Sequence, residues 1–261
     1  MKKIAIKFGK IAAAIGFWIF VWYLISKAVG IELILPSPYS VFLALVDLVK
    51  TSIFWTSTAL SFLRVLGGIM ISLVIGCGLA YLMSHSKIIN TLFSPILAII
   101  KATPVASFII IAWLWINTSV LPVFISSLIV IPIITANVSE GISSIDKDLY
   151  EVASLYRFSP FKKLFKLYIP SIAPFFIAAC RSSLGMAWKA SVAAELIVIS
   201  KNSIGREMFY AKQGLETATV FAWTVVVIIL SIVFEYFTMI ALNKLGNRLS
   251  VIRKGETYVE D

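Results

Sequence analysis

The sequence has few of the side chains that usually carry catalysis, metal binding or covalent cross-links. Its 261 residues include two cysteines, Cys77 and Cys180, and one histidine, His85. Both cysteines lie inside apolar stretches, which predicts two small buried residues and neither a disulfide nor a metal pair. A lone histidine without neighbouring cysteines does not make a zinc site. We therefore expect this chain to bind no metal and no cofactor of its own.

Charged residues are also scarce. They make up 14% of the chain, against about 25% in a typical soluble domain. Hydrophobic residues make up 60%, and they fall in blocks of about 20 residues, the length that crosses the hydrocarbon core of a bilayer. This pattern predicts an all-α integral membrane protein, a single domain over residues 1–261 with no room for a large soluble domain.

The apolar blocks predict six transmembrane helices. Their approximate ranges are 8–29, 58–83, 92–115, 119–138, 171–199 and 217–241. The first block is longer than the core of a cleaved signal peptide, so we interpret 8–29 as a first anchor helix. The lysines and arginines outside the spans concentrate on the side of the N-terminus, which predicts a multi-pass protein with both termini cytoplasmic. Because they lie at the ends of apolar blocks, the net charge of +10 does not indicate binding to nucleic acid.

The longest polar segment is a basic loop over 139–170. Asp146 can cap a first short helix, and Ser159-Pro160 supplies a cap and a first residue for a second. Each helix carries an apolar stripe at i, i+3, i+4 and i+7: Leu149, Val152, Ala153 and Tyr156, then Phe161, Leu164, Phe165 and Tyr168. Two short amphipathic helices with a bend near Arg157 fit either a surface that lies on anionic lipid or one that docks on a partner protein.

The segment Glu151-Val-Ala-Ser-Leu-Tyr-Arg-Phe-Ser-Pro-Phe161 followed by Ile169-Pro170 resembles the EAA loop of permease subunits in bacterial ATP-binding-cassette importers. The spacing from glutamate to proline matches that of the loop. Arg157 stands where the family usually has glycine. If the bend needs a positive φ, a non-glycine residue there costs about 1 kcal/mol. We therefore expect either that the turn differs in detail from that of the family, or that Phe158 and Ser159 form the bend.

Three further segments are similar to the nitrate/sulfonate/taurine type of importer permease. They are Leu35-Pro-Ser-Pro38, Lys101-Ala-Thr-Pro-Val-Ala106 and Trp188-Lys-Ala-Ser-Val-Ala-Ala-Glu195. The resemblance implies a type I importer permease fold with its core at about 56–241. It also implies a permease in the bacterial cytoplasmic membrane that pairs with a second permease copy, identical or different. An external solute-binding protein would deliver the solute.

The resemblance further implies that the loop docks on a separate cytoplasmic ATPase dimer, which would hold ATP and Mg. Glu151, Ala153, Phe161 and Pro170 match the family positions in this loop. We assign Phe161 and Leu164 as apolar anchors for the ATPase and Glu151 as the polar contact that orients the loop. The sequence agrees with a separate ATPase, because it contains no G-x-x-x-x-G-K-[ST] phosphate loop. We therefore expect a transport subunit and not an enzyme.

Ionisable residues within the spans need shielding by protein or water. Candidates for a translocation path are Lys101, Thr103, Arg181, Lys189 and Glu195. The alternative for the charged ones is structural pairing. For Arg64 and Glu235 we expect either a position at the membrane interface or such pairing. Thr103-Pro104 would act as a gate hinge or as a simple kink.

The charges along the candidate path are positive on balance, which suits an anion such as nitrate, a sulfonate or taurine. Related importers also carry vitamin precursors. A different hypothesis is an ion-coupled secondary transporter, which would need inverted repeats and its own ion site, and neither is visible. A membrane-embedded enzyme finds no support, because the spans hold no histidine cluster and no pair of neighbouring acids.

Overall fold

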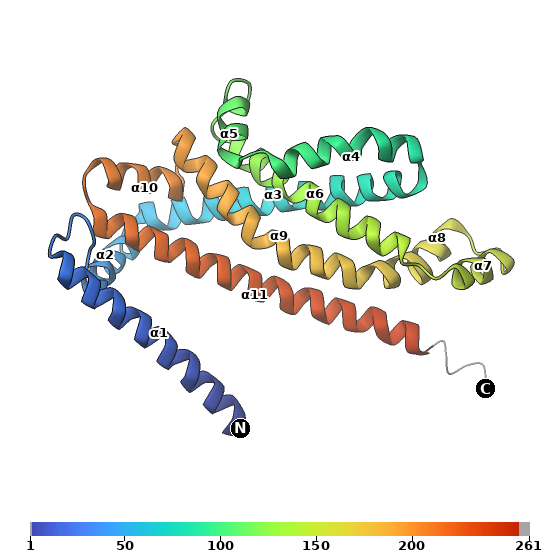
Figure 1. Ribbon diagram of the computed structural model, residues 1–261, viewed down its shortest axis with the longest axis horizontal. Coiled ribbons are helices and arrows are strands. Elements are labelled where there is room, and N and C mark those ends of the chain that lie inside the picture. Colours follow the sequence, from blue (N-terminus) through green and yellow to red (C-terminus); the bar gives the residue numbers. More distant parts are fainter. Residues whose placement is uncertain (1, 256–261) are drawn as a thin grey trace.

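The computed structural model describes the backbone of residues 2–255 and the side chains of residues 9–244, except that of residue 147. Every regular element in the described range is helical, and most helices run along one long axis (Figure 1). In chain order the elements are α1 (Lys2–Val29), α2 (Pro38–Val49), α3 (Ser52–His85), α4 (Lys87–Ala102), α5 (Val105–Trp113), α6 (Leu121–Ser143), α7 (Lys147–Leu155), α8 (Pro160–Lys163), the π-helical turn η1 (Leu164–Tyr168), α9 (Ile169–Val198), α10 (Ile204–Gln213) and α11 (Thr217–Gly255).

Five helical segments are long and apolar enough to cross a membrane: Gly9–Val29, Ser52–His85, Leu121–Ser143, Pro160–Val198 and Thr217–Lys244. They confirm the expected all-α membrane fold. The helix ends differ from the sequence-based boundaries at one place that affects the site. Helix α6 continues to Ser143, so residues 139–143, which we had assigned to the polar loop, form its last turn.

The third expected span, 92–115, is broken. Helices α4 and α5 meet at an angle of 104° across Thr103-Pro104. Pro104 has no N–H to donate to the Ile100 carbonyl, which ends α4. The Thr103 N–H and hydroxyl both donate to the Ile99 carbonyl, at 3.0 and 2.8 Å. Helix α5 has 9 residues, about 14 Å, and cannot cross a core of about 30 Å. The segment therefore turns sharply and does not form one straight span.

Helices α3, α6 and α9 form the core of the bundle. Glycines let α3 approach α6 closely: a Cβ at Gly68 would lie 2.9 Å from the Val123 carbonyl oxygen, and one at Gly76 would lie 3.3 Å from that of Ile131. This matches the small-residue packing used between helices in lipid. The fully buried Trp188 side chain of α9 packs against the same cluster. Helix α1 stands apart from this core, and its side chains are mostly exposed (Figure 1).

The connecting elements gather at the two ends of the bundle. The turn between α3 and α4, helices α7 and α8, and the end of α11 lie at one end, and α2 and α10 lie at the other (Figure 1). Helix α2 is a short amphipathic helix. Ser37 caps it by accepting the Ser40 N–H, and the helix buries Val41.

Candidate functional site

The bend between α7 and α8 is formed by Arg157, in a left-handed conformation with φ of 49°. The Phe158 N–H donates to the Ala153 carbonyl, and the Arg157 N–H donates to the Ser154 carbonyl, each at 3.0 Å. These two bonds make a Schellman motif, the usual way to end a helix on a left-handed residue. The sequence led us to expect a turn that differs in detail or a bend at Phe158 and Ser159, but the structure has the positive φ at Arg157 itself.

Contacts between the two short helices fix their relative position. The Lys163 ammonium donates to the Ser154 hydroxyl at 3.0 Å and lies 4.8 Å from the centre of the Tyr150 ring. Asp146 caps α7 by accepting the Asp148 N–H, and Ser159 caps α8 by accepting the Lys162 N–H. Caps and cross-contacts of this kind hold the loop in one shape before any partner binds.

Large apolar side chains project from this loop outside the bundle. We call this set the loop surface; its members are Val152, Leu155, Tyr156, Phe161 and Phe165. Leu155, Tyr156 and Phe161 are 79%, 74% and 76% exposed. Exposed apolar side chains gathered on one loop at the end of the bundle make it a candidate surface for contact with another molecule.

The residues that match the EAA docking positions occupy different environments. Phe161 belongs to the loop surface, and Glu151 is exposed. Ala153 is only 4% exposed, so it packs inside the loop and does not present its side chain to a partner. Pro170 does not interrupt the chain, because helix continues from Pro160 to Val198 through η1. There the Ile169 N–H donates to the Leu164 carbonyl five residues back.

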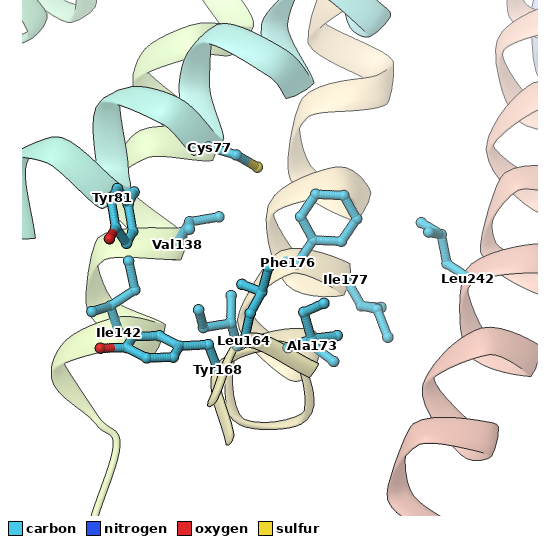
Figure 2. Close-up of a pocket in the computed structure, with 12 residues that line it drawn as sticks. Cys77, Tyr81, Val138, Ile142, Leu164, Tyr168, Ala173, Phe176, Ile177 and Leu242 are labelled. Carbon is cyan, nitrogen blue, oxygen red and sulfur yellow. The ribbon is translucent and has the colours of Figure 1, made fainter. Parts of the chain in front are cut away.

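Leu164 is 42% exposed, less than Phe161, because it also faces an internal cavity. Leu164 lines a cavity of about 330 Å³ together with Tyr81, Ile142, Tyr168 and Leu242 (Figure 2). These side chains come from α3, α6, η1 and α11, and they surround the place where the loop joins the bundle. Of the two expected apolar anchors, only Phe161 points fully outward; Leu164 is partly enclosed.

Glu151 lies at the edge of a second cavity, of about 450 Å³. His85 and Ser84 from the end of α3 line it, as do Tyr150 and Tyr168. The His85 ring lies 6.2 Å from that of Tyr168, centre to centre. This cavity is more polar than the first, and it places the Glu151 carboxyl beside the turn that joins α3 to α4. No group of three or more metal-ligating side chains occurs among the described residues.

At the other end of the bundle, Glu195 and Arg64 form a buried ion pair with 3.0 Å between Oε1 and Nη1. The Glu195 carboxylate, 0% exposed, also accepts the Ser61 hydroxyl at 2.7 Å and the Gly205 N–H at 3.3 Å. The Arg64 guanidinium donates to the Lys201 carbonyl at 2.8 Å. We call this group the Arg64–Glu195 clasp. It ties α3, the end of α9 and the start of α10 together.

The clasp changes the interpretation of Glu195. Its carboxylate is enclosed by protein and is not exposed to solvent, so we no longer count Glu195 among the path residues. Arg64 has the structural pairing that was one of the two expectations for it. Gly205 is needed at this point because a Cβ there would lie 2.4 Å from the Leu196 nitrogen. The sequence does not reveal the pair, because its members are 131 positions apart.

The remaining path candidates lie on open faces of the bundle. Arg181 and Lys189 are exposed on one side of α9, eight positions apart and so about 80° from each other. Lys101 is exposed at the end of α4, next to the break that begins at Thr103. None of these three cations forms an ion pair among the residues that the structure describes.

Comparisons with known proteins agree with this architecture. The family described as "Binding-protein-dependent transport system inner membrane component" matches residues 68–250. The bicarbonate transport system permease protein CmpB of Synechocystis sp. is 29% identical over 59% of this chain and 55% of its own length. The chain thus matches about half of that relative. The putative aliphatic sulfonates transport permease protein SsuC of Bacillus subtilis is 24% identical over 81% of this chain and 77% of its own.

Solved structures show the same fold. A bacterial ATP-binding-cassette transporter involved in the import of the acidic polysaccharide alginate contains a chain with a TM-score of 0.58 to this one. The two are 15% identical, and the match covers 94% of this chain and 97% of that one. The matched family spans α6, the loop surface and α9, the elements that carry the features described above. This chain therefore belongs to the family of inner membrane components of binding-protein-dependent transport systems, as a multi-pass permease subunit.

Proposed function

We propose that this permease forms the translocation path for a small anion and is driven by a separate cytoplasmic ATPase that docks on the loop surface. A binding protein outside the membrane delivers the anion, and a second permease copy completes the path. The observation that carries the proposal is the loop surface itself, with Phe161 76% exposed at an end of the bundle. The end that holds α7 and α8 is then cytoplasmic, as the distribution of lysine and arginine predicts.

A protein partner fits the loop surface better than lipid does. Helix α7 carries apolar side chains together with Asp148 and Glu151, and Asp146 caps it. Anionic head groups would repel these three carboxylates. A protein groove can instead cover the apolar side chains and pair the exposed Glu151 with a cation. Burying one phenylalanine in such a groove contributes about 2 kcal/mol, which corresponds to roughly 30-fold in affinity.

The proposed anion rests on the exposed cations of the bundle. Lys101, Arg181 and Lys189 lie on open faces without an ion pair among the described residues. Such groups favour a negative solute in a low-dielectric passage. The names of CmpB and SsuC refer to bicarbonate and aliphatic sulfonates, both anionic. We expect the solute to carry a small anionic group, as nitrate, the sulfonates and the sulfonate end of taurine do.

The coupling proposal is tested with Glu151→Ala, Phe161→Ala and the double variant in the complete importer. Each should lower ATP-driven uptake and uptake-coupled ATP hydrolysis while membrane insertion stays normal. Phe20→Ala is a matched control, because Phe20 is 56% exposed on α1, far from the loop surface. Full uptake by the double variant would refute docking through these residues.

A further inference from the structure

Helix α4 carries a continuous polar face. Lys87, Asn90, Thr91, Ser94 and Lys101 recur at helical spacing and fall within an arc of about 100°. We call these five residues the polar face of α4. All five are exposed, and the remaining residue in the arc is Ala98. The face extends over 14 positions, or about 21 Å, which is most of the thickness of a hydrocarbon core of about 30 Å.

The rest of α4 divides into two apolar faces. Ile89, Phe93 and Ile100 are partly buried on the side that packs against α3 and α6. Ile88, Leu92 and Ile99 are 81%, 60% and 61% exposed on a separate side. The second of these faces suits lipid, and the first is covered by the bundle. The polar face of α4 neither suits lipid nor packs on the bundle, so it requires an environment different from both.

Lipid does not provide that environment. Polar and charged side chains within a bilayer are costly unless they meet protein or water. Two hydroxyl groups of the polar face of α4 have hydrogen-bond acceptors within the helix. Thr91 donates to the Lys87 carbonyl at 2.9 Å, and Ser94 donates to the Asn90 side-chain oxygen at 2.8 Å. Neither lysine forms an ion pair with any residue whose side chain the structure describes. Their ammonium groups still require hydration or a partner.

A tight contact with a second copy does not meet this requirement either. Two identical permeases related by a two-fold axis along the membrane normal would bring Lys101 close to Lys101 of the other copy. Like charges removed from water repel, and this side of α4 offers no carboxylate to separate them. Water remains as the environment that satisfies both lysines and the Asn90 amide.

We propose that the polar face of α4 lines a water-filled part of the translocation path, on the side of the membrane where the loop surface lies. The inference rests on the proposed transport function and assigns one surface that lines the path. Helix α6 lies between α4 and α9 (Figure 1), so the polar face of α4 and the cations of α9 lie on helices that flank α6. Asn90 and Ser94 are then neutral hydrogen-bonding residues that a passing solute contacts.

Cysteine accessibility in the complete importer tests this proposal. Cys77 and Cys180 are first replaced by alanine, and single cysteines are placed at Asn90 and Ser94. Matched controls are Leu92→Cys and Ile99→Cys, which are exposed in the chain but lie on the apolar side. Inside-out vesicles are treated with a charged, membrane-impermeant methanethiosulfonate. Because the reagent reacts with hydrated thiolate, the two polar-face positions should react at least about tenfold faster than the controls.

Equal rates at all four positions, or faster reaction at the controls, would overturn the proposal. So would a disulfide between the two copies formed from Ser94→Cys, because it would show that this face is a contact between permeases. ATP-driven uptake by each variant is measured in parallel. Uptake that persists while the labelling pattern fails would leave the transport function intact and refute only the inference about α4. Absence of uptake by the cysteine-free parent importer with its partners would instead count against the proposed function.

Discussion

The Arg64–Glu195 clasp predicts how its single and double variants rank in stability. Arg64→Met leaves a carboxylate with no cation in a site that is 0% exposed, which should cost about 3–5 kcal/mol. Glu195→Gln should cost less, about 1.5–3 kcal/mol. The reason is that Arg64 is 12% exposed and keeps the carbonyls of Lys201 and Asn202 as acceptors. The double variant should be more stable than Arg64→Met alone, since it no longer contains an unpaired buried charge.

The measurement is reversible unfolding of the purified permease by detergent titration in mixed micelles. Tryptophan fluorescence reports it, because Trp188 and Trp223 are 0% and 1% exposed in the folded chain. Lys50→Met is the control, since it removes an ion pair with Asp47 that is largely exposed, and it should cost less than about 1 kcal/mol. If Arg64→Met were as stable as the parent, or if the two single effects simply added in the double variant, the clasp would not be a coupled pair.

Two further predictions concern the backbone. Arg157→Gly should stabilise the bend after α7 by about 1 kcal/mol, seen as slower amide hydrogen exchange at Phe158, because glycine adopts the positive φ without strain; unchanged or faster exchange would contradict this explanation. Gly205→Ala should unfold the start of α10 and lower the thermal stability sharply, because its Cβ would lie 2.4 Å from the Leu196 nitrogen. Gly78→Ala, where no atom lies within 4 Å of the added Cβ, should have little effect, and equal losses at both glycines would refute the steric argument.

The parts of the fold that depend on local sequence could be predicted. Asp146 and Ser159 cap their helices as expected, because a cap needs only a side chain and an N–H two or three residues away. The bend near Arg157 was also predicted, but the positive φ of Arg157 itself was not, because a strained conformation is adopted only when surrounding contacts hold it. The apolar blocks predicted the membrane helices for the same reason: the length of a span is set by the bilayer.

Features that depend on distant contacts could not be predicted. The pairing of Arg64 with Glu195 arises only when α3, α9 and α10 come together, so Glu195 seemed as suited to a path as Lys189. Leu164 is exposed as expected, but its additional place in the lining of a cavity depends on Tyr81, Ile142 and Leu242 from distant parts of the chain. The polar face of α4 is different, because its helical spacing is visible in the sequence. Its function could be inferred only with the structure, which shows that neither α3 nor α6 covers this face.

The continuity of helix from Pro160 to Val198 has a mechanical consequence. Over 39 residues, this element is about 58 Å long, and it has the loop surface near one end and Glu195 near the other. A rod of this length that tilts by about 10° around its middle moves each end by about 5 Å, in opposite directions. A force applied at Phe161 would therefore displace the clasp at the other end of the element. The π-helical turn Leu164–Tyr168 and Pro174 both lie in the half of the element nearer the loop surface, so bending at either place would reduce the movement that reaches the clasp.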